Sequence, residues 1–290
     1  MDIRPQIAFT KTKENQALRL QRLRARVTFN GKMQDKQSEK DVRGIKINKV
    51  GVKGLRYPII VRDLAHKTQN TVATISMSVD LPHHFKGTHM SRFVEVMNNH
   101  GRILHVENIP DILRQMRKQL DAKYAHLQIE FPYFIEKKAP ITHAPGMMDY
   151  VATFLASTEG DDIDFVLGVT VPVTTLCPCS KAISARGAHN QRGEVNLQVR
   201  SHTTIWIEEL IQWVEQSASS ELYSLLKRKD EKHVTERAYD HPVFVEDLVR
   251  NIAVQLRKDS RVQWYRVEAE NFESIHNHSA YAMVESRPKK

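Results

Sequence analysis

The chain contains very little cysteine, with only Cys177 and Cys179 among its 290 residues. Two cysteines separated by one residue cannot form a disulfide framework, and a bridge between them would be strained. The sequence therefore predicts a reducing compartment and thiolate chemistry at these two positions.

Long apolar runs are also missing. The longest uncharged stretch, 165–180, is too short and too rich in Thr and Pro to cross a membrane. The first residues are followed by polar side chains where a secretory signal would need an apolar segment. These absences predict a cytoplasmic protein with no membrane partner.

Glycine and proline are scarce, with 11 residues of each, whereas 41% of the residues are hydrophobic. This composition excludes a low-complexity or wholly disordered chain. A length of 290 residues accommodates one large domain or two modest ones, and a sizeable core.

The positive charge is confined to one end of the chain. The formal net charge is +9, and residues 1–54 alone hold fourteen basic and five acidic side chains, so the rest of the chain is neutral. We therefore predict a flexible basic extension over residues 1–48 and a folded body over residues 49–290. The extension could bind RNA or an anionic surface, or it could be a solvated tail; nucleic acid is not expected to bind the neutral body.

The hydrophobic pattern predicts an α+β fold in two halves, about 55–157 and 162–286. Each half has the order ββααββ, with alternating strands and helices that carry one apolar stripe. We expect each half to form an antiparallel sheet backed by helices. Sheet faces and edges left uncovered would favour assembly with other subunits.

Polar residues with metal-binding chemistry gather in the middle of the second half. Cys177 and His189 lie twelve positions apart across a loop that contains glycine. A thiolate and an imidazole on such a loop can bind one metal ion, although a Cys and a His can equally serve packing. The polarity of the loop favours a site over a simple strand connection.

A second polar stretch, 270–279, joins the last two predicted strands. It contains Glu273 and His276, a carboxylate and an imidazole suited to metal binding or to proton transfer near neutral pH. The alternative is an exposed hairpin loop.

A third stretch, 86–92, precedes the first predicted helix. Lys86, His89, Ser91 and Arg92, together with backbone N–H groups at a helix start, suit an oligophosphate, although helix capping explains part of the pattern. Two further carboxylates are Glu231, in the polar link 229–232 after a helix expected over 207–226, and Glu246, in the first turn of a helix expected over 242–258. Taken singly, each is interpreted as a solvated charge.

Four strings of the sequence together resemble the type IB GTP cyclohydrolase I family. They are KGTHMSRF (86–93), LCPCSK (176–181), GAHNQR (187–192) and ENFESIHNHSAYA (270–282), and the resemblance runs from about residue 48 to residue 285. It implies the tunnelling fold (T-fold), a bimodular catalytic domain whose subunits join into barrels. It also implies a homotetramer with active sites at subunit interfaces.

The resemblance further implies a hydrolase that converts GTP and water to 7,8-dihydroneopterin triphosphate and formate, the first step of tetrahydrofolate and in some organisms queuosine biosynthesis. A divalent metal (Zn, Mn or Fe) would be held by Cys177, His189 and Glu231. Glu246 would bind guanine. The triphosphate would contact Lys86, His89, Ser91 and Arg92. Lys181 and Arg192 are further candidates for this contact.

The roles of the remaining motif residues stay open. His276, with Glu273 nearby, is either a further ligand or the acid that protonates the purine, and Cys179 either assists proton transfer or is inert. Two other functions fit parts of the sequence. One is a related enzyme acting on a pterin or deazapurine, such as a nitrile reductase with a cysteine nucleophile, and the other is a non-catalytic basic RNA-binding protein with a structural zinc.

Overall fold

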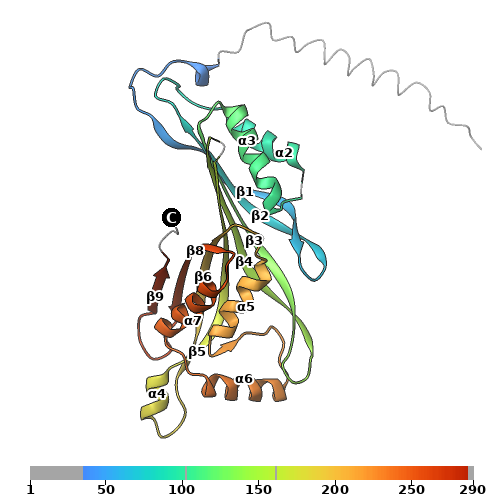
Figure 1. The fold of residues 1–290 in the computed structure, drawn as a ribbon, viewed down its shortest axis with the longest axis vertical. Coiled ribbons are helices and arrows are strands. Elements are labelled where there is room, and N and C mark those ends of the chain that lie inside the picture. Colours follow the sequence, from blue (N-terminus) through green and yellow to red (C-terminus); the bar gives the residue numbers. More distant parts are fainter. Residues whose placement is uncertain (1–34, 102, 161, 287–290) are drawn as a thin grey trace, which may run out of the picture.

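A computed structural model describes residues 35–286 of the chain, except residues 102 and 161. Its framework is one antiparallel sheet in the order β1-β2-β3-β4-β5-β6-β8-β9, with the short β7 paired to β5 (Figure 1). The strands are β1 (Ile47–Asp63), β2 (Lys67–Leu81), β3 (Tyr124–Lys138), β4 (Pro145–Glu159), β5 (Asp162–Leu176), β6 (Asn190–Ser201), β7 (Ser220–Glu221), β8 (Val262–Asn271) and β9 (Ala280–Glu285).

The helices pack against one face of this sheet. Side chains from α3, α5 and α7 join the strand residues in a single buried apolar cluster. The helices are η1 (Lys36–Ser38), α2 (Ser91–His100), η2 (Val106–Asn108), α3 (Ile109–Leu120), α4 (Pro178–Ile183), α5 (Ile207–Ser217), α6 (Arg228–Asp240) and α7 (Val245–Lys258). In Figure 1, α2 and α3 lie at the end of the molecule opposite to α4 and α6.

The period of the apolar residues explains which face is covered. On β2, Ile75 and Met77 are buried while Ser76 between them is not, because successive side chains of a strand point to opposite faces. On α7, Leu248, Ile252 and Leu256 recur at helical spacing and are fully buried. The apolar side chains of the strands and of the helices therefore pack together in one core layer between the sheet and the helices.

The expected fold class is wrong. The prediction was a tunnelling fold with a separate sheet in each half and barrels formed between subunits. Instead, β4 pairs with β5 from Val151↔Thr170 to Glu159↔Asp162, so both groups of strands share one open sheet and one core. The strand and helix order was anticipated, but pattern alone did not reveal that the halves fuse edge to edge.

Helix α6 was not predicted, because RKDEKHVTERAYD offers little apolar periodicity; its residues 229–232 were interpreted as a polar link. Tertiary contacts explain the helix instead. Fully buried Asp230 accepts hydrogen bonds from the N–H groups of Ile141 and Thr142 in the β3–β4 loop, each at 2.9 Å. Burial alone would raise the pKa of Asp230, but these bonds hold it below its usual range.

The predicted basic extension lies outside the described residues as far as residue 34. From residue 35 onward the chain contacts the segment before α2: the Lys86 N–H donates to the Glu39 carbonyl, and the Gly87 N–H to that of Gln37, both at 3.1 Å. In residues 35–286, apart from the two gaps, no helix has both the length and the apolar character that a membrane crossing would require.

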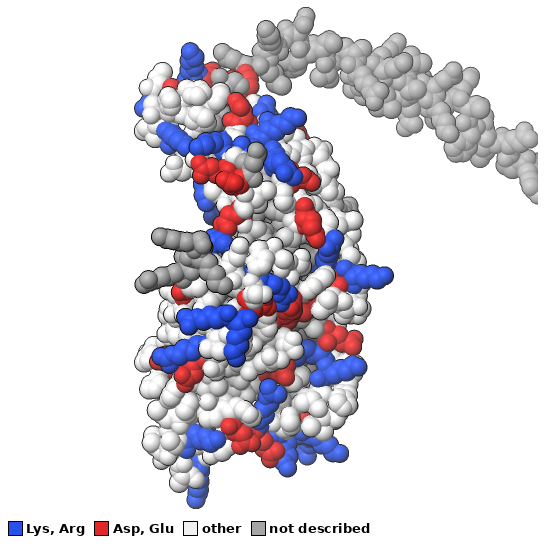
Figure 2. All heavy atoms as spheres, in the orientation of Figure 1, with Lys and Arg blue, Asp and Glu red and all other residues white. Residues whose placement is uncertain are grey.

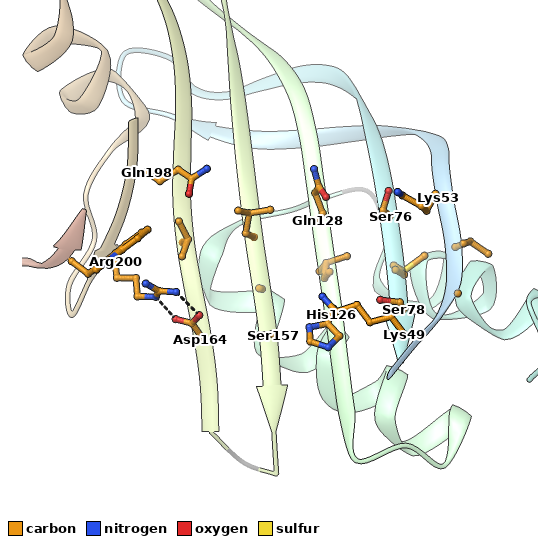
Figure 3. A pocket seen from close by; sticks show the side chains of 18 residues that line it. Lys49, Lys53, Ser76, Ser78, His126, Gln128, Ser157, Asp164, Gln198 and Arg200 are labelled. Atoms are coloured by element: carbon orange, nitrogen blue, oxygen red, sulfur yellow. Dashed lines mark hydrogen bonds and ion pairs between the residues drawn. The ribbon is translucent and has the colours of Figure 1, made fainter. Parts of the chain in front are cut away.

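The sheet face without helices is hollowed into a cavity of about 670 Å³ (Figure 3). Arg200 there donates two hydrogen bonds to Asp164, at 2.6 and 2.9 Å, and lies over the Trp264 ring. Lys49 and Lys53 add positive charge. Over the face shown in Figure 2, basic and acidic side chains are interspersed. None of the residues predicted for the site lines this cavity.

A buried ionic cluster ties β3 to α5 and β7. The Lys137 ammonium lies 2.8 Å from a Glu215 carboxylate oxygen and 2.7 Å from one of Glu221, and all three side chains are largely buried. The Tyr150 hydroxyl also donates to Glu215. Burial raises the pKa of Glu215, while the Lys137 charge opposes the rise.

Replacing Lys137 with Met should lower the free energy of unfolding by about 3–5 kcal/mol, because it leaves the buried Glu215 carboxylate without a cation and Glu221 with only Arg237, at 3.9 Å. Urea unfolding measures this loss. Lys232→Met is the matched control: Lys232 pairs with Glu236 but its side chain is 74% exposed, so the change should stay within about 0.5 kcal/mol. Equal effects of the two variants would contradict the prediction.

Candidate active site

Cys177 and His189 meet where the β5–β6 ladder ends. The ladder pairs Thr175 with Gln191 and Leu176 with Asn190, and the Cys177 N–H then donates to the His189 carbonyl at 3.1 Å. Residues that face each other across antiparallel strands have Cβ atoms about 4.5–5.5 Å apart. We therefore expect the thiol and the imidazole to project side by side from these two adjacent segments of the chain.

Helix α4 closes the loop between these two residues. Cys177 is its N-cap, and the Ser180 N–H donates to the Cys177 Sγ at 3.4 Å. Pro178 suits the first turn, where its missing N–H costs nothing. The Ser180 hydroxyl accepts a hydrogen bond from the His189 N–H at 2.9 Å, so the loop is tied back to the start of β6.

Three oxygen atoms surround Nδ1 of the His189 ring. Gln191 Oε1 lies at 3.0 Å, Ser274 Oγ at 3.5 Å and Glu273 Oε2 at 3.9 Å. The side chains of His189 and Glu273 are only 13% and 12% exposed. Glu273 Oε2 is buried without a hydrogen-bond partner. A buried carboxylate oxygen of this kind suits a nearby cation or proton donor.

The third predicted metal ligand does not join this pair within one chain. Glu231 is exposed and follows Asp230, at the end of α6 that contacts the β3–β4 loop. The other end, at Tyr239, contacts Lys181 of α4 and lies eight residues, or about 12 Å, along the helix axis. In residues 35–286, gaps aside, no three His, Cys, Asp or Glu side chains are arranged as a complete metal site.

The predicted guanine-binding residue lies in a segment tied to Cys177. The Val243 N–H donates to the carbonyl of Leu176, the residue before Cys177, at 3.1 Å. Helix α7 begins two residues later, and Glu246 is exposed in its first turn. Cys179 is exposed on α4. The Lys181 ammonium donates to the Tyr239 carbonyl and lies over the Tyr239 ring, so it joins α4 to α6.

His276 is exposed in the loop after β8, the loop that also carries Glu273. Its ring stacks on that of His278, with 5.3 Å between centroids. The Phe272 N–H donates to the carbonyl of Arg192 at 2.9 Å, which holds the start of this loop against β6. The loop therefore lies beside His189, as the contact of Glu273 with its ring also shows.

The predicted triphosphate residues lie around the start of α2, at the end of the molecule opposite to α4 (Figure 1). There Lys86 pairs with Glu39, and His89 Nε2 lies 3.2 Å from Asp35. Arg92 donates to the carbonyl of Gln119 at 2.9 Å, and Ser91 is the exposed first residue of α2. A single chain thus does not unite these residues with Cys177 and His189.

Several polar residues of the site were not anticipated. Thr175, Ser180, Gln191 and Ser274 all take part in the contacts of the Cys177–His189 loop. Only the strand register could have revealed Thr175 and Gln191, because they lie sixteen positions apart. Large apolar side chains are also exposed in the flanking segments, including Ile183 at 86% and Ile275 at 65%.

Comparison with known proteins identifies relatives along most of the chain. Residues 33–282 match the family model described as "Type I GTP cyclohydrolase folE2". The "GTP cyclohydrolase FolE2" of Syntrophotalea carbinolica is 56% identical over 89% of this chain and 96% of its own length. That of Geobacter sulfurreducens is 54% identical over 89% of this chain and 100% of its own. The prediction from the motifs is thus confirmed as far as type I GTP cyclohydrolase, while its type IB subdivision is finer than this match.

Among solved structures, a highly active mutant of Bacillus sp. TB-90 urate oxidase has a TM-score of 0.50 at 10% identity, covering 83% of this chain and 99% of that one. At this identity the likeness concerns the fold alone. It corrects the expected tunnelling barrel to a large antiparallel sheet with helices, like that of the urate oxidase.

Gly193 lets β6 and β8 approach closely beside the site. A Cβ there would lie 2.7 Å from Asn271 Oδ1 and 3.1 Å from the Glu270 carbonyl oxygen. Gly193→Ala should therefore lower the free energy of unfolding by about 1–3 kcal/mol, measured by thermal or urea unfolding.

Gly168→Ala on the neighbouring β5 is the control. Its added Cβ would meet no atom closer than 3.5 Å, which is ordinary van der Waals contact. We expect a change within about 1 kcal/mol of the wild type, in either direction. A Gly193→Ala variant as stable as Gly168→Ala would show that the strands separate without cost.

Proposed function

Because the chain belongs to the type I GTP cyclohydrolase folE2 family, we propose that it converts GTP and water to 7,8-dihydroneopterin triphosphate and formate. This hydrolysis is a step of folate biosynthesis. The family match over residues 33–282 carries the proposal. The type IB subdivision, a role in queuosine biosynthesis and a cytoplasmic location are finer parts of the same proposal.

The Cys177–His189 pair supports a divalent metal site. A thiolate sulfur and an imidazole nitrogen in adjacent positions are ligands that Zn²⁺ accepts, and a harder third ligand such as a carboxylate also admits Mn²⁺ or Fe²⁺. Held by Cys177 and His189, such a metal would supply Lewis-acid activation of water for attack at C8 of guanine. Glu231 as the third ligand stays a prediction that needs more than one chain, or a different α6 position.

The surrounding residues bind the base and move protons. A carboxylate can accept hydrogen bonds from both N1–H and N2–H₂ of guanine, and Glu246 lies in the helix turn tied to the Cys177 segment. Opening the imidazole ring needs a proton at purine N7, and His276 is an exposed imidazole in the adjoining loop. Glu273 lies in the same loop, and Cys179 is a further candidate for proton transfer.

We expect the separated triphosphate residues to act from a second copy of the chain. Lys86, His89, Ser91 and Arg92 lie at the end of the molecule opposite to α4 (Figure 1). The exposed apolar residues Ile183 and Ile275 flank the Cys177 end and suit an interface. A homo-oligomer, for which the family resemblance implies a homotetramer, would join the two ends.

Cys177→Ala and His189→Ala should each abolish formate release from GTP and stoichiometric metal binding, because each removes a ligand from a site with few others.

Glu246→Gln should raise KM for GTP on the order of tenfold or more while metal binding stays intact, since the amide cannot accept both guanine donors. Formate and oxidised pterin fluorescence are measured with Mn²⁺, Fe²⁺ and Zn²⁺ in turn. The absence of product with all three metals would contradict the proposed activity.

Mixing two inactive variants tests the shared site. Lys86→Ala and Cys177→Ala, dissociated and reassembled together, should recover about a quarter of wild-type activity, because half of the interfaces are mixed and one of two sites in each is intact. Cys177→Ala mixed with His189→Ala is the control and should recover nothing, since both changes fall at the same end. Equal recovery in both mixtures would refute the shared site.

A further inference from the structure

Gln191 is a buried polar side chain that faces the ring of His189. It is 8% exposed and lies directly opposite Thr175, which is fully buried. Its Nε2 donates to the Thr175 hydroxyl at 2.9 Å. Its Oε1 lies 3.0 Å from His189 Nδ1. Because i and i+2 residues share a strand face, Thr175, Cys177, His189 and Gln191 form two adjacent cross-strand pairs on one face of the sheet.

The surroundings of Nδ1 determine which ring nitrogen carries the proton. The Gln191 amide oxygen accepts but cannot donate, and the nearest oxygen of Glu273, 3.9 Å away and without a hydrogen-bond partner, is a second acceptor. Ser274 Oγ, at 3.5 Å, can do either. An Nδ1 lone pair would face two acceptors, whereas an Nδ1–H group has partners for its proton. A neutral imidazole with its proton on Nδ1 carries its lone pair on Nε2.

We propose that Gln191, anchored by Thr175, is a positioning residue that holds His189 in the Nδ1–H tautomer and directs the Nε2 lone pair to the metal. The metal part rests on the proposed function; the tautomer does not. Partners behind a metal-bound histidine fix its ring orientation and raise its basicity, and their loss commonly weakens metal binding 10–100-fold.

If the side-chain amide of Gln191 were flipped, His189 would take the opposite tautomer, which can be measured. The Thr175 hydroxyl could also donate, and a flipped Gln191 would then point its NH₂ at His189. Nδ1 would become the acceptor, and its lone pair would lie 3.9 Å from a Glu273 oxygen that has no hydrogen-bond partner of its own. That arrangement leaves two acceptors facing each other at the site.

The same two strands provide a matched control. Thr170 of β5 lies opposite Asn196 of β6, and the Asn196 amide donates to the Thr170 hydroxyl at 3.2 Å. This pair repeats the amide-to-threonine contact five positions along the ladder from the site. Asn196→Leu therefore removes a less buried amide-to-threonine hydrogen bond, on the other face of the same two strands, without touching His189.

The first test uses metal-free protein labelled with ¹⁵N-histidine. The ring nitrogens of His189, identified by their loss in His189→Asn, should report a proton on Nδ1 in the wild type and in Asn196→Leu. In Gln191→Leu the proton should shift toward Nε2, while Gln191→Glu should keep it on Nδ1 because its carboxylate still accepts. A wild-type ring with its proton on Nε2 would overturn the inference.

The second test measures metal affinity by competition with a chelator, using Zn²⁺ as the probe. Gln191→Leu should bind 10–100-fold more weakly, whereas Gln191→Glu and Asn196→Leu should stay within about threefold of the wild type. Unchanged affinity in Gln191→Leu would refute the positioning role. A wild type that binds no metal would contradict the proposed function, while the ¹⁵N measurement would still decide the tautomer.

Discussion

The hydrogen-bond ladder between β5 and β6 places the residues at the centre of the candidate site. Its register sets Cys177 opposite His189 and Thr175 opposite Gln191. The Leu176 carbonyl accepts from Val243, which ties the segment before α7 to the same point. A slip of one residue would turn each of these side chains to the other face of the sheet. Stability and chemistry thus depend on the same backbone pairing.

The sheet also separates the molecule into a packed face and an open one. The helices bury one apolar face, and the candidate site lies at the margin of that layer, where Thr175 and Gln191 are already shielded from water. The hollow on the open face carries Lys49, Lys53 and the Arg200–Asp164 pair instead (Figure 3). This hollow and the Cys177–His189 site therefore lie in different places, and none of the predicted site residues lines the hollow.

Periodic apolar patterns were the reliable part of the sequence. The helix expected over 242–258 is confirmed as α7, Val245–Lys258, because its apolar stripe is buried against the sheet. The helix expected over 207–226 ends at Ser217, and β7 and α6 follow. Helix α6 depends on distant contacts such as those of Asp230 with the β3–β4 loop, which no local pattern records. The predicted fold class was wrong for the same reason, since the pairing of β4 with β5 is a tertiary contact that local sequence patterns do not reveal.

Side-chain type and order along the chain were enough to predict the residue chemistry: a thiol pair, a loop with Cys177 and His189, a polar stretch with Glu273 and His276, and a basic segment before the first helix. Which of these groups lie together depends on how the strands pair. Strand register joins Cys177 to His189 and adds Gln191, whereas Lys86 and Arg92 lie by α2 at the far end of the molecule, because the sheet of this chain runs from β1 to β9 without closing on itself.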